Sequence, residues 1–448
     1  MFENFVDFKN KLREKSVAIL GIGVSNTPLL KMLCNFDCKI TIRDKTVNLS
    51  DEILEIIKNN NIEAILGENY LDNITENYVF RSPGIMPTNK KLIKAVENGS
   101  ILTSEMEVFF DICPAKIIGI TGSDGKTTTT TLIYETLKLA GVTCHLGGNI
   151  GEPLLPHINE IDKNDIVVVE LSSFQLMTMK KGADIAVITN LAPNHLDKHT
   201  DMAEYIKAKT NIFKNNCKQL ILNAGNDITS SFIDEKSITF SLKSKQKNGA
   251  YLENGKIYFK DEFVMNASDI KLPGIHNVDN YLAAICAVSE LCDLKYVEQI
   301  AKSFGGVEHR IEFVREVNGV KYYNDSIASS PSRAIAGLRA FDKKVIIISG
   351  GSDKGISFDP FAEVVTERVK EIIVMGETKE KIKKSILKFD ENFPITDAVD
   401  ITDAVNKVKR MASEGDIVIL CPACASFDFF KNFMERGIRF KELVNEIS

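Results

Sequence analysis

The most constraining feature of this chain is a glycine-rich loop that follows an apolar run and opens a helical pattern. The run covers residues 117–120, glycines stand at positions 119, 122 and 125, and Lys126 and Thr127 begin the helical pattern. A strand, a glycine loop and a helix in this order direct backbone N–H groups and a helix N-terminus at a phosphate. The match to G-x-x-x-x-G-K-[ST] is imperfect, because its first glycine would fall at Ile120. An ordinary glycine turn is the alternative, but the context favours a nucleoside triphosphate site.

Composition narrows the class of protein. A chain of 448 residues exceeds one hydrophobic core, so two or three domains are expected. Hydrophobic content of 44% and charged content of 26% are ordinary for a globular protein. A formal net charge of −6 without a basic block argues against nucleic acid as a partner.

The chain also lacks signals for a membrane or an oxidising compartment. No apolar stretch reaches the ~18 residues of a membrane span, and the mixed, acidic N-terminus has no signal-peptide pattern. Nine cysteines, scattered mostly in apolar segments, indicate reduced thiols. Cys421 and Cys424 have C-x-x-C spacing without a second pair nearby, so we interpret them as structural. We expect a cytoplasmic protein with no membrane partner.

An apolar β-rich run, a glycine loop and a helical pattern recur along the chain. This alternation predicts an α/β fold of parallel sheets with crossover helices. The predicted strands are residues 16–20, 39–44, 78–80, 165–170, 185–190, 320–323, 345–348, 371–374 and 416–420. A polar stretch at 241–254 predicts short strands or a loop, and an alanine-rich helix is expected from residue 280 to about 291. The pattern predicts three domains, residues 1–112, 113–309 and 310–448.

The first glycine loop argues against a dehydrogenase. Gly21 and Gly23 match two glycines of the dinucleotide fingerprint, but Asn26 holds the position of the third. A side chain there obstructs the close helix–strand packing of the fingerprint. Asp44 ends the next predicted strand, as in Rossmann units. A nucleotide-phosphate site of another kind and a purely structural turn both stay open.

Three further residues lie where chemistry is expected, just beyond strands or shortly after. Glu170 ends a buried strand and could hold Mg²⁺ together with the Thr127 hydroxyl, or it could cap the helix that follows. His195 lies in a proline-containing loop without apolar periodicity, which favours a ligand or hydrogen-bonding role over a packed core histidine. Lys209 falls on a helical stretch, and spacing alone predicts a solvated lysine equally well.

With these segments the chain resembles the Mur ligase family of peptidoglycan synthesis along essentially its whole length. The markers are GITGSDGKTT at 119–128, GGNIG at 147–151, ELSSFQL at 170–176, NHLD at 194–197, HN at 276–277, EHR at 308–310, NDS at 324–326 and PACAS at 422–426. The ELSSFQL and PACAS segments look most like the member that adds D-glutamate. The resemblance implies a Rossmann-like UDP-binding domain, a central P-loop-type ATPase domain and a Rossmann-like amino-acid-binding domain.

The family resemblance implies an ATP-dependent amide ligase. ATP would phosphorylate the carboxylate of UDP-N-acetylmuramoyl-L-alanine, and the amine of D-glutamate would attack the acyl phosphate. Bringing two anions together requires cations and donors placed beforehand. Lys126, His195 and Lys209 would be the catalytic residues. By the same resemblance, the ATP contacts would be Gly122, Ser123, Asp124, Gly125, Lys126, Thr127, Thr128, Asn280, His309, Arg310 and Asp325.

The remaining implied contacts concern metal ions and the other two substrates. Two Mg²⁺ ions would have Thr127, Glu170, His195 and Lys209 as ligands, with Lys209 carried as a carbamate whose oxygens suit a hard metal ion. The UDP substrate would contact Val24, Ser25, Asn26, Asp44, Ser82, Gly84, Asn149 and Ser172. D-glutamate would contact Lys354, Ser426 and Phe433, where a lysine and a serine donor suit an acidic amino acid. A monomer is expected.

Two positions depart from the family pattern. Ile327 stands where one form of the pattern has a lysine, so one cation for the side-chain carboxylate is missing, and Ser329 with backbone donors could replace it. Asp124 replaces the more usual asparagine and adds negative charge near the triphosphate unless it points away. The alternatives are a relative that adds another amino acid, folylpolyglutamate synthase, and a non-catalytic nucleotide-binding protein of the same fold.

Overall fold

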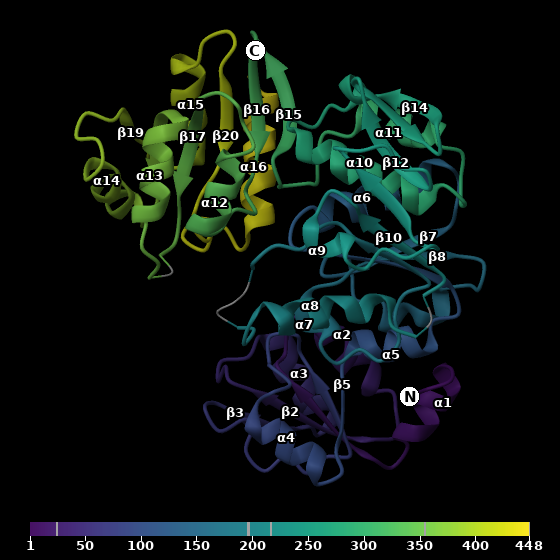
Figure 1. The fold of residues 1–448 in the computed structure, drawn as a ribbon. Helices are drawn as coiled ribbons and strands as arrows, with labels where there is room; N and C mark the ends of the chain where they lie inside the picture. The colour runs from purple at the N-terminus through teal and green to yellow at the C-terminus, as the bar shows by residue number, and fades with distance from the viewer. Residues whose placement is uncertain (24–25, 195–197, 216, 354, 448) are drawn as a thin grey trace. The chain divides into compact units, whose positions relative to one another are not determined.

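The computed structural model describes residues 1–23, 26–194, 198–215, 217–353 and 355–447, which form three sheets with flanking helices (Figure 1). The chain divides into two compact units, residues 1–267 with 278–300 and residues 268–277 with 301–448. The first unit holds a five-stranded and a nine-stranded sheet, and the second holds a six-stranded sheet. The predicted α/β fold of three successive sheets is confirmed. The domain limits after residues 112 and 309 stay predictions.

The five-stranded sheet is parallel throughout and has the strand order β3-β2-β1-β4-β5. Its strands are β1 (Ser16–Leu20), β2 (Lys39–Asp44), β3 (Glu63–Leu66), β4 (Tyr78–Arg81) and β5 (Ile101–Thr103). The accompanying helices are α1 (Phe5–Leu12), α2 (Asn26–Leu33), α3 (Asp51–Asn60), α4 (Lys90–Glu97) and α5 (Glu105–Ile112). The strand order reverses between β1 and β4, and open α/β sheets bind ligands at the carboxyl ends of strands at such a point.

The nine-stranded sheet carries the phosphate loop and has the order β14-β13-β12-β11-β10-β9-β6-β8-β7. Its strands are β6 (Lys116–Thr121), β7 (Cys144–Gly148), β8 (Ile166–Glu170), β9 (Ile185–Ile188), β10 (Gln219–Asn223), β11 (Ile238–Ser241), β12 (Gly249–Glu253), β13 (Lys256–Phe259) and β14 (Glu262–Asn266). The edge strands β12, β13 and β14 pair with one another antiparallel, and the other pairs are parallel. Within the stretch 241–254, predicted as short strands or a loop, residues 242–248 form a loop and Gly249–Glu253 form the short strand β12.

The helical segments of this region lie mostly in the crossovers between its strands. They are α6 (Lys126–Leu139), η1 (Leu155–Glu160), α7 (Ser173–Leu176), α8 (Met202–Thr210), η2 (Asn211–Phe213), α9 (Asp227–Ser230), η3 (Ala267–Asp269), α10 (Ile275–Val288) and α11 (Lys295–Ser303). The predicted helix from residue 280 is α10, which begins five residues earlier and ends at Val288. One hydrophobic cluster joins the two sheets of the first unit, since it contains Leu29 of α2, Phe109 of α5 and Val169 of β8.

The six-stranded sheet has the order β15-β16-β20-β17-β18-β19, and only the β15–β16 pair is antiparallel. Its strands are β15 (Glu312–Val317), β16 (Val320–Asn324), β17 (Val345–Gly350), β18 (Val369–Met375), β19 (Ile395–Asp397) and β20 (Ile417–Leu420). Its helices are α12 (Pro331–Leu338), α13 (Asp359–Arg368), α14 (Lys379–Leu387), α15 (Ile401–Met411) and α16 (Phe433–Asn445).

Both faces of this sheet are buried, which explains its nearly continuous apolar strands. Successive side chains of a strand point to opposite faces. Val345 and Ile347 of β17 accordingly join a cluster with α12, α13 and α14, whereas Ile346 and Ile348 join one with α15 and α16 (Figure 1). Within the described ranges, no helix is both long and apolar enough to cross a membrane.

Candidate active site

The phosphate loop lies between β6 and α6, and its shape depends on two glycines with positive φ. Gly122 has φ 153° and Gly125, the N-cap of α6, has φ 76°. A Cβ atom at Gly122 would lie 1.9 Å from Thr189 Oγ1, and one at Gly125 would lie 2.2 Å from Asn280 Oδ1. Only glycine fits both the torsion and the space at these positions. The contact also brings two predicted ATP residues, Gly125 and Asn280, together.

The segment after β9 holds this loop in place. Ser123 N donates to Asn190 O, and Asp124 N donates to Asn190 Oδ1, each at 2.9 Å. The buried Ser123 Oγ donates to Ala192 O at 2.8 Å and pairs with Tyr205 Oη at 2.9 Å. Asp124 itself is exposed, so its charge faces solvent at the loop surface.

Two lysines converge on the same carbonyl of the loop. Lys126 Nζ donates to Gly122 O at 2.9 Å and to Ser123 O at 2.8 Å. Lys209 Nζ donates to Gly122 O at 2.7 Å and to Thr121 Oγ1 at 3.1 Å. The interpretation of Lys209 as a solvated lysine is wrong, because its side chain is 1% exposed. The helix α8 turns Lys209 inward beside Tyr205, one turn earlier, whose ring centroid lies 5.0 Å from the Lys209 ammonium.

Burial and a neighbouring charge make Lys209 an unusual amine. Burial lowers its pKa well below the ordinary value, and the positive charge of Lys126 lowers it further. The negative charges of Glu170 and Asp124 act in the opposite direction but are smaller causes. A neutral amine has a free electron pair that can attack CO₂, whereas an ammonium has none. The environment of Lys209 therefore fits the predicted carbamate.

Glu170 ends β8 as a buried carboxylate with one unpaired oxygen. Its side chain is 1% exposed, and Oε1 accepts a hydrogen bond from Asn149 Nδ2 at 2.9 Å. Oε2 is buried without a hydrogen-bond partner among the described residues. A buried, unpaired carboxylate oxygen is costly unless a cation reaches it, so Glu170 fits the predicted metal role. Among the described residues, no three His, Cys, Asp or Glu side chains gather as a metal site, around Glu170 or at another place.

The alternative role of Glu170 as a helix cap is wrong, because Ser172 caps α7. Ser172 Oγ accepts from Gln175 N at 3.3 Å, and the Gln175 side chain accepts in return from Ser172 N at 2.9 Å. This reciprocal capping box satisfies two backbone donors at the start of the helix. The predicted substrate contact of Ser172 stays a prediction.

The predicted ATP contacts Thr127 and Thr128 lie in the first turn of α6, where Thr127 is buried and Thr128 is half-buried.

The loops after β1 and β4 meet at the switch point of the first sheet. A Cβ atom at Gly21, whose φ is 78°, would lie 2.7 Å from Ser82 Oγ. Asp44 Oδ2 accepts from Ile22 N at 2.6 Å, so the strand-end acid orders the glycine loop. Gly84 is exposed on the neighbouring loop. The structure thus places predicted UDP contacts at the ends of neighbouring strands of one sheet.

Asn26 explains the missing third glycine of the first loop. Its side chain is 1% exposed and its Nδ2 donates to Gly21 O at 2.8 Å and to Leu20 O at 3.2 Å. Asn26 is the first residue of α2. Where a glycine would leave room for close packing, its side-chain amide fills the space and hydrogen-bonds the glycine loop. The predicted contact of Asn26 with a diphosphate stays a prediction.

In the second unit, His309 and Asp325 lie beside Asn324 at the end of β16. His309 has φ 63°, is 4% exposed and pairs through Nδ1 with Asn324 Nδ2 at 2.9 Å. Asp325 Oδ1 accepts from Ile311 N at 3.2 Å, and burial raises the pKa of Asp325 to about 7. Arg310, the next predicted ATP contact, follows His309 directly. The predicted ATP residues are thus divided between the two units.

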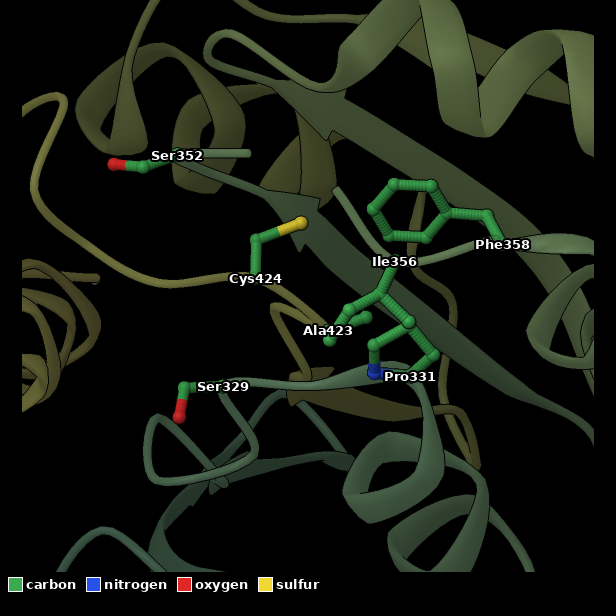
Figure 2. Close-up of a pocket in the computed structure, with 7 residues that line it drawn as sticks. All are labelled: Ser329, Pro331, Ser352, Ile356, Phe358, Ala423 and Cys424. Atoms are coloured by element: carbon green, nitrogen blue, oxygen red, sulfur yellow. The ribbon is translucent and has the colours of Figure 1, made fainter. Parts of the chain in front are cut away.

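A small pocket opens at the carboxyl edge of the six-stranded sheet (Figure 2). Three loops line it, those after β16, β17 and β20, through Ser329, Pro331, Ser352, Ile356, Phe358, Ala423 and Cys424. The buried Ser426 lies two residues beyond Cys424 on the third loop, and Phe433 begins α16. The ring of Phe433 packs edge-on against His309, with centroids 5.9 Å apart.

Some predicted residues lie outside the described part of the chain. They are Val24, Ser25, His195 and Lys354.

The two cysteines of the C-x-x-C pair are buried thiols, and burial raises the pKa of Cys424 to about 11, which keeps it protonated. Such inert thiols are consistent with a structural role.

Sequence reasoning missed several residues that organise the site. Tyr205 was absent from the predicted set, although its (i, i+4) spacing from Lys209 on one helix was a usable signal. Arg81 is also buried, and it donates to Phe174 O at 3.0 Å and to Thr178 Oγ1 at 3.1 Å. Arg81 thus joins the end of β4 in the five-stranded sheet to α7 and the residues just after it, which follow β8 of the nine-stranded sheet. No local sequence pattern reveals such a contact.

Two protein-family descriptions and many known proteins match this chain. The family descriptions that match are Mur ligase middle domain over residues 120–288 and Mur ligase, glutamate ligase domain over residues 309–424. A UDP-N-acetylmuramoylalanine--D-glutamate ligase of Clostridium kluyveri is 48% identical over 460 residues, covering 100% of both chains. The chain belongs to the Mur ligase family. Another similar Mur ligase is the UDP-N-acetylmuramoylalanine--D-glutamate ligase of Acetivibrio thermocellus, which is 50% identical over 462 residues and 98% of each chain.

Solved Mur ligase structures share the fold. The UDP-N-acetylmuramate-alanine ligase of Thermotoga maritima has a TM-score of 0.59 at 18% identity, covering 97% of this chain and 100% of its own. A pseudomurein peptide ligase type C from Methanothermus fervidus has a TM-score of 0.54 at 19% identity, covering 97% and 100%. The three-sheet architecture is thus that of the Mur ligase family.

Proposed function

We propose that this chain is an ATP-dependent ligase that joins D-glutamate to UDP-N-acetylmuramoyl-L-alanine in the cytoplasmic part of peptidoglycan synthesis. One observation carries the proposal: a phosphate loop, a buried carboxylate and a buried lysine converge within the first unit. Likeness to D-glutamate ligases over the full length supports the choice of amino acid. We infer a cytoplasmic, monomeric enzyme.

The proposed reaction has two steps that balance. The substrate carboxylate attacks the γ-phosphorus of ATP, which forms the acyl phosphate and releases ADP. The amine of D-glutamate then attacks the acyl carbon, loses a proton, and expels phosphate as the amide bond forms. Both reactants are anions in the first step, so positive charge and N–H donors must offset their repulsion. Lys126 and the amides of the glycine loop supply them.

We assign two Mg²⁺ ions to the residues predicted as metal ligands, of which His195 lies outside the described part of the chain. Thr127, Glu170, His195 and carbamylated Lys209 would hold them, and Mg²⁺ would neutralise charge on the phosphates. The unpaired Oε2 of Glu170 and the depressed pKa of Lys209 support this assignment. Asn149 holds Glu170 through its amide group and so fixes the direction of the carboxylate.

The other two substrates are assigned to the carboxyl ends of strands in the five-stranded and six-stranded sheets. The UDP portion would lie at the switch point of the first sheet, near Asp44, Ser82 and Gly84. D-glutamate would lie at the pocket of the second unit, with Ser426 and Phe433 as predicted contacts. The third predicted contact, Lys354, lies outside the described residues. A purely nucleotide-binding protein would have little use for the buried pair of Glu170 and Lys209, which disfavours the non-catalytic alternative.

The deciding experiment measures phosphate release from ATP with UDP-N-acetylmuramoyl-L-alanine and a panel of amino acids. D-glutamate should support turnover, whereas L-glutamate, L-lysine, L-alanine and diaminopimelate should not. UDP-N-acetylmuramic acid without its alanine is the matched control and should be a poor acceptor. Selectivity for L-lysine or diaminopimelate would reject the proposed amino acid, and activity with a folate would reject the proposed acceptor.

A further inference from the structure

Arg436 is a buried guanidinium that no step of the proposed reaction uses. It lies on α16, three residues after Phe433, and is 1% exposed. Its Nε donates to Ser326 Oγ at 3.0 Å, and its Nη2 donates to Ser326 O at 2.9 Å. Its Nη1 donates to Ala425 O at 3.0 Å, and Nη2 also reaches Cys424 O at 3.2 Å. One side chain therefore ties the loop after β16 to the loop after β20.

These contacts lie directly behind the pocket of the second unit. Cys424 lines that pocket, and Ser329 lines it from the loop that Ser326 begins (Figure 2). The third loop lies beside it, since a Cβ atom added at Gly351 would lie 3.2 Å from Arg436 Nη1, and Ser352 N donates to Ala425 O, which also accepts from Arg436. Ser326 Oγ donates in turn to Phe433 O at 2.7 Å, which fixes the first turn of α16. The guanidinium thus hydrogen-bonds two of the three loops that line the pocket and lies beside the third.

Arg436 also places a buried positive charge there, and a carboxylate that acts on it is Asp428, which accepts from Ser352 Oγ at 3.5 Å. Its four acceptors are neutral oxygens, and no carboxylate of the described residues forms an ion pair with it. Burial lowers the pKa of Arg436 to about 10, so the group stays charged at neutral pH. Among the described carboxylates, the exposed Asp428 is the one whose charge raises the pKa of Arg436. A hydrogen-bonded charge in a poorly screened interior acts over longer distances than one in water.

We propose that Arg436 is the positioning residue of the amino-acid pocket: it holds the three loops in register and gives the pocket a positive potential that favours an acidic amino acid. The proposal rests on the assignment of D-glutamate to this pocket. It gives the helix α16 a role in amino-acid recognition through a side chain that does not contact the substrate.

The test compares Arg436→Met and Arg436→Lys with a matched control, Arg439→Met. Arg439 lies on the same helix with a half-buried side chain, and it pairs only with Glu442 among the described residues. Phosphate release is measured while each of the three substrates is varied. Arg436→Met should raise the KM for D-glutamate about tenfold or more, because four charge-assisted hydrogen bonds are lost. The KM values for ATP and for UDP-N-acetylmuramoyl-L-alanine should change less than about twofold.

Arg436→Lys keeps the charge but not the forked geometry, so it should raise the KM for D-glutamate by about threefold to fivefold. Arg439→Met should leave all three KM values unchanged. A purely structural role predicts a lower melting temperature with the KM for D-glutamate unchanged, or an equal rise in all three, and either result overturns the proposal. If Arg436→Met does not fold, Arg436→Lys decides by the same criterion. Failure of the proposed function would appear in the unsubstituted chain, which would release no phosphate with D-glutamate.

Discussion

The phosphate loop of the first unit and the pocket of the second are built in different ways. The loop is one continuous stretch whose shape comes from glycine torsions and backbone donors, with Gly122 and Gly125 at its turns. The pocket is assembled from three loops that are far apart in sequence and share one buried guanidinium, Arg436. A continuous motif is visible in a sequence, whereas a site assembled from separate loops depends on the sheet that brings them together.

The two sites also contain one buried cation each, and burial has opposite consequences for them. Lys209 and Arg436 are both 1% exposed, and burial lowers both pKa values. The amine of Lys209 becomes able to lose its proton and react, because its pKa falls well below the ordinary value. The pKa of Arg436 falls only to about 10, so its charge persists. Lysine thus serves where chemistry is needed and arginine where a permanent charge is needed.

Lys126→Ala tests the phosphate loop most severely. Loss of the ammonium beside the transferring phosphate should reduce turnover by about a thousandfold or more, since it removes charge stabilisation at the transition state. The melting temperature should change little, and Lys138→Ala, an exposed lysine on the same helix, should retain full activity. Measured phosphate release near the normal rate in Lys126→Ala would remove the loop from the proposed mechanism.

Lys209→Ala tests the reactive member of the two buried cations. We expect turnover to fall by about a hundredfold, because the proposed metal site loses an anionic ligand. Added acetate or formate should restore part of the activity, since a small carboxylate can occupy the space of the carbamate. Lys207→Ala on the exposed face of α8 is the control. Full activity of Lys209→Ala without an additive would rule out the carbamate.

Gly125→Ala tests whether the loop depends on glycine space as well as glycine torsion. Gly141, at the other end of α6, has a similar φ of 81°, but a Cβ atom there would meet no atom within 4 Å, so Gly141→Ala introduces torsional strain alone. Gly141→Ala should cost about 1 kcal/mol, and Gly125→Ala about 1–3 kcal/mol more, with a raised KM for ATP. Equal losses of thermal stability would show that Asn280 moves aside at no cost.

The smallest expected effect is a pH dependence of stability, to which each unit contributes one buried carboxyl group. Burial raises the pKa of Asp325 in the second unit, and of Glu105 in the first, to about 7. The folded chain keeps protons that the unfolded chain releases near pH 4, so these groups make stability fall as pH rises from about 4 to 7. Each contributes on the order of a few kcal/mol at most.

Asp325→Asn and Glu105→Gln should each reduce the loss of stability between pH 5 and pH 8, because a neutral amide cannot release a proton. Thermal unfolding at both pH values measures this difference against the unsubstituted chain. The double substitution should add the two effects, since the groups lie in separate units. An unchanged pH dependence in both single variants would mean that these carboxyls ionise normally in the folded chain.

Much of the fold could be predicted because parallel sheets buried on both faces require nearly continuous apolar strands. The runs at β1, β2, β17 and β20 met this requirement and were predicted close to their bounds. Several strands were missed, among them β3, β5, β7, β10, β15 and β19. Of these, β3 is short and exposed to half-buried, and β15 mixes charged with apolar residues. The start of α10 was predicted too late because its first turn, Ile275 and His276, is exposed and carries no apolar signal.

The residues of the candidate site likewise fall into those that the sequence predicted and those that only the structure revealed. The sequence alone determined the glycine loop, its lysine and the acid at the end of β8, because strand, loop and helix follow one another directly in the chain. Only the tertiary structure decided that Lys209 is buried, that Ser172 rather than Glu170 caps α7, and that Arg436 lies behind the pocket. Burial and hydrogen-bond partners depend on segments tens to hundreds of residues apart, and no local pattern encodes which of those segments will meet.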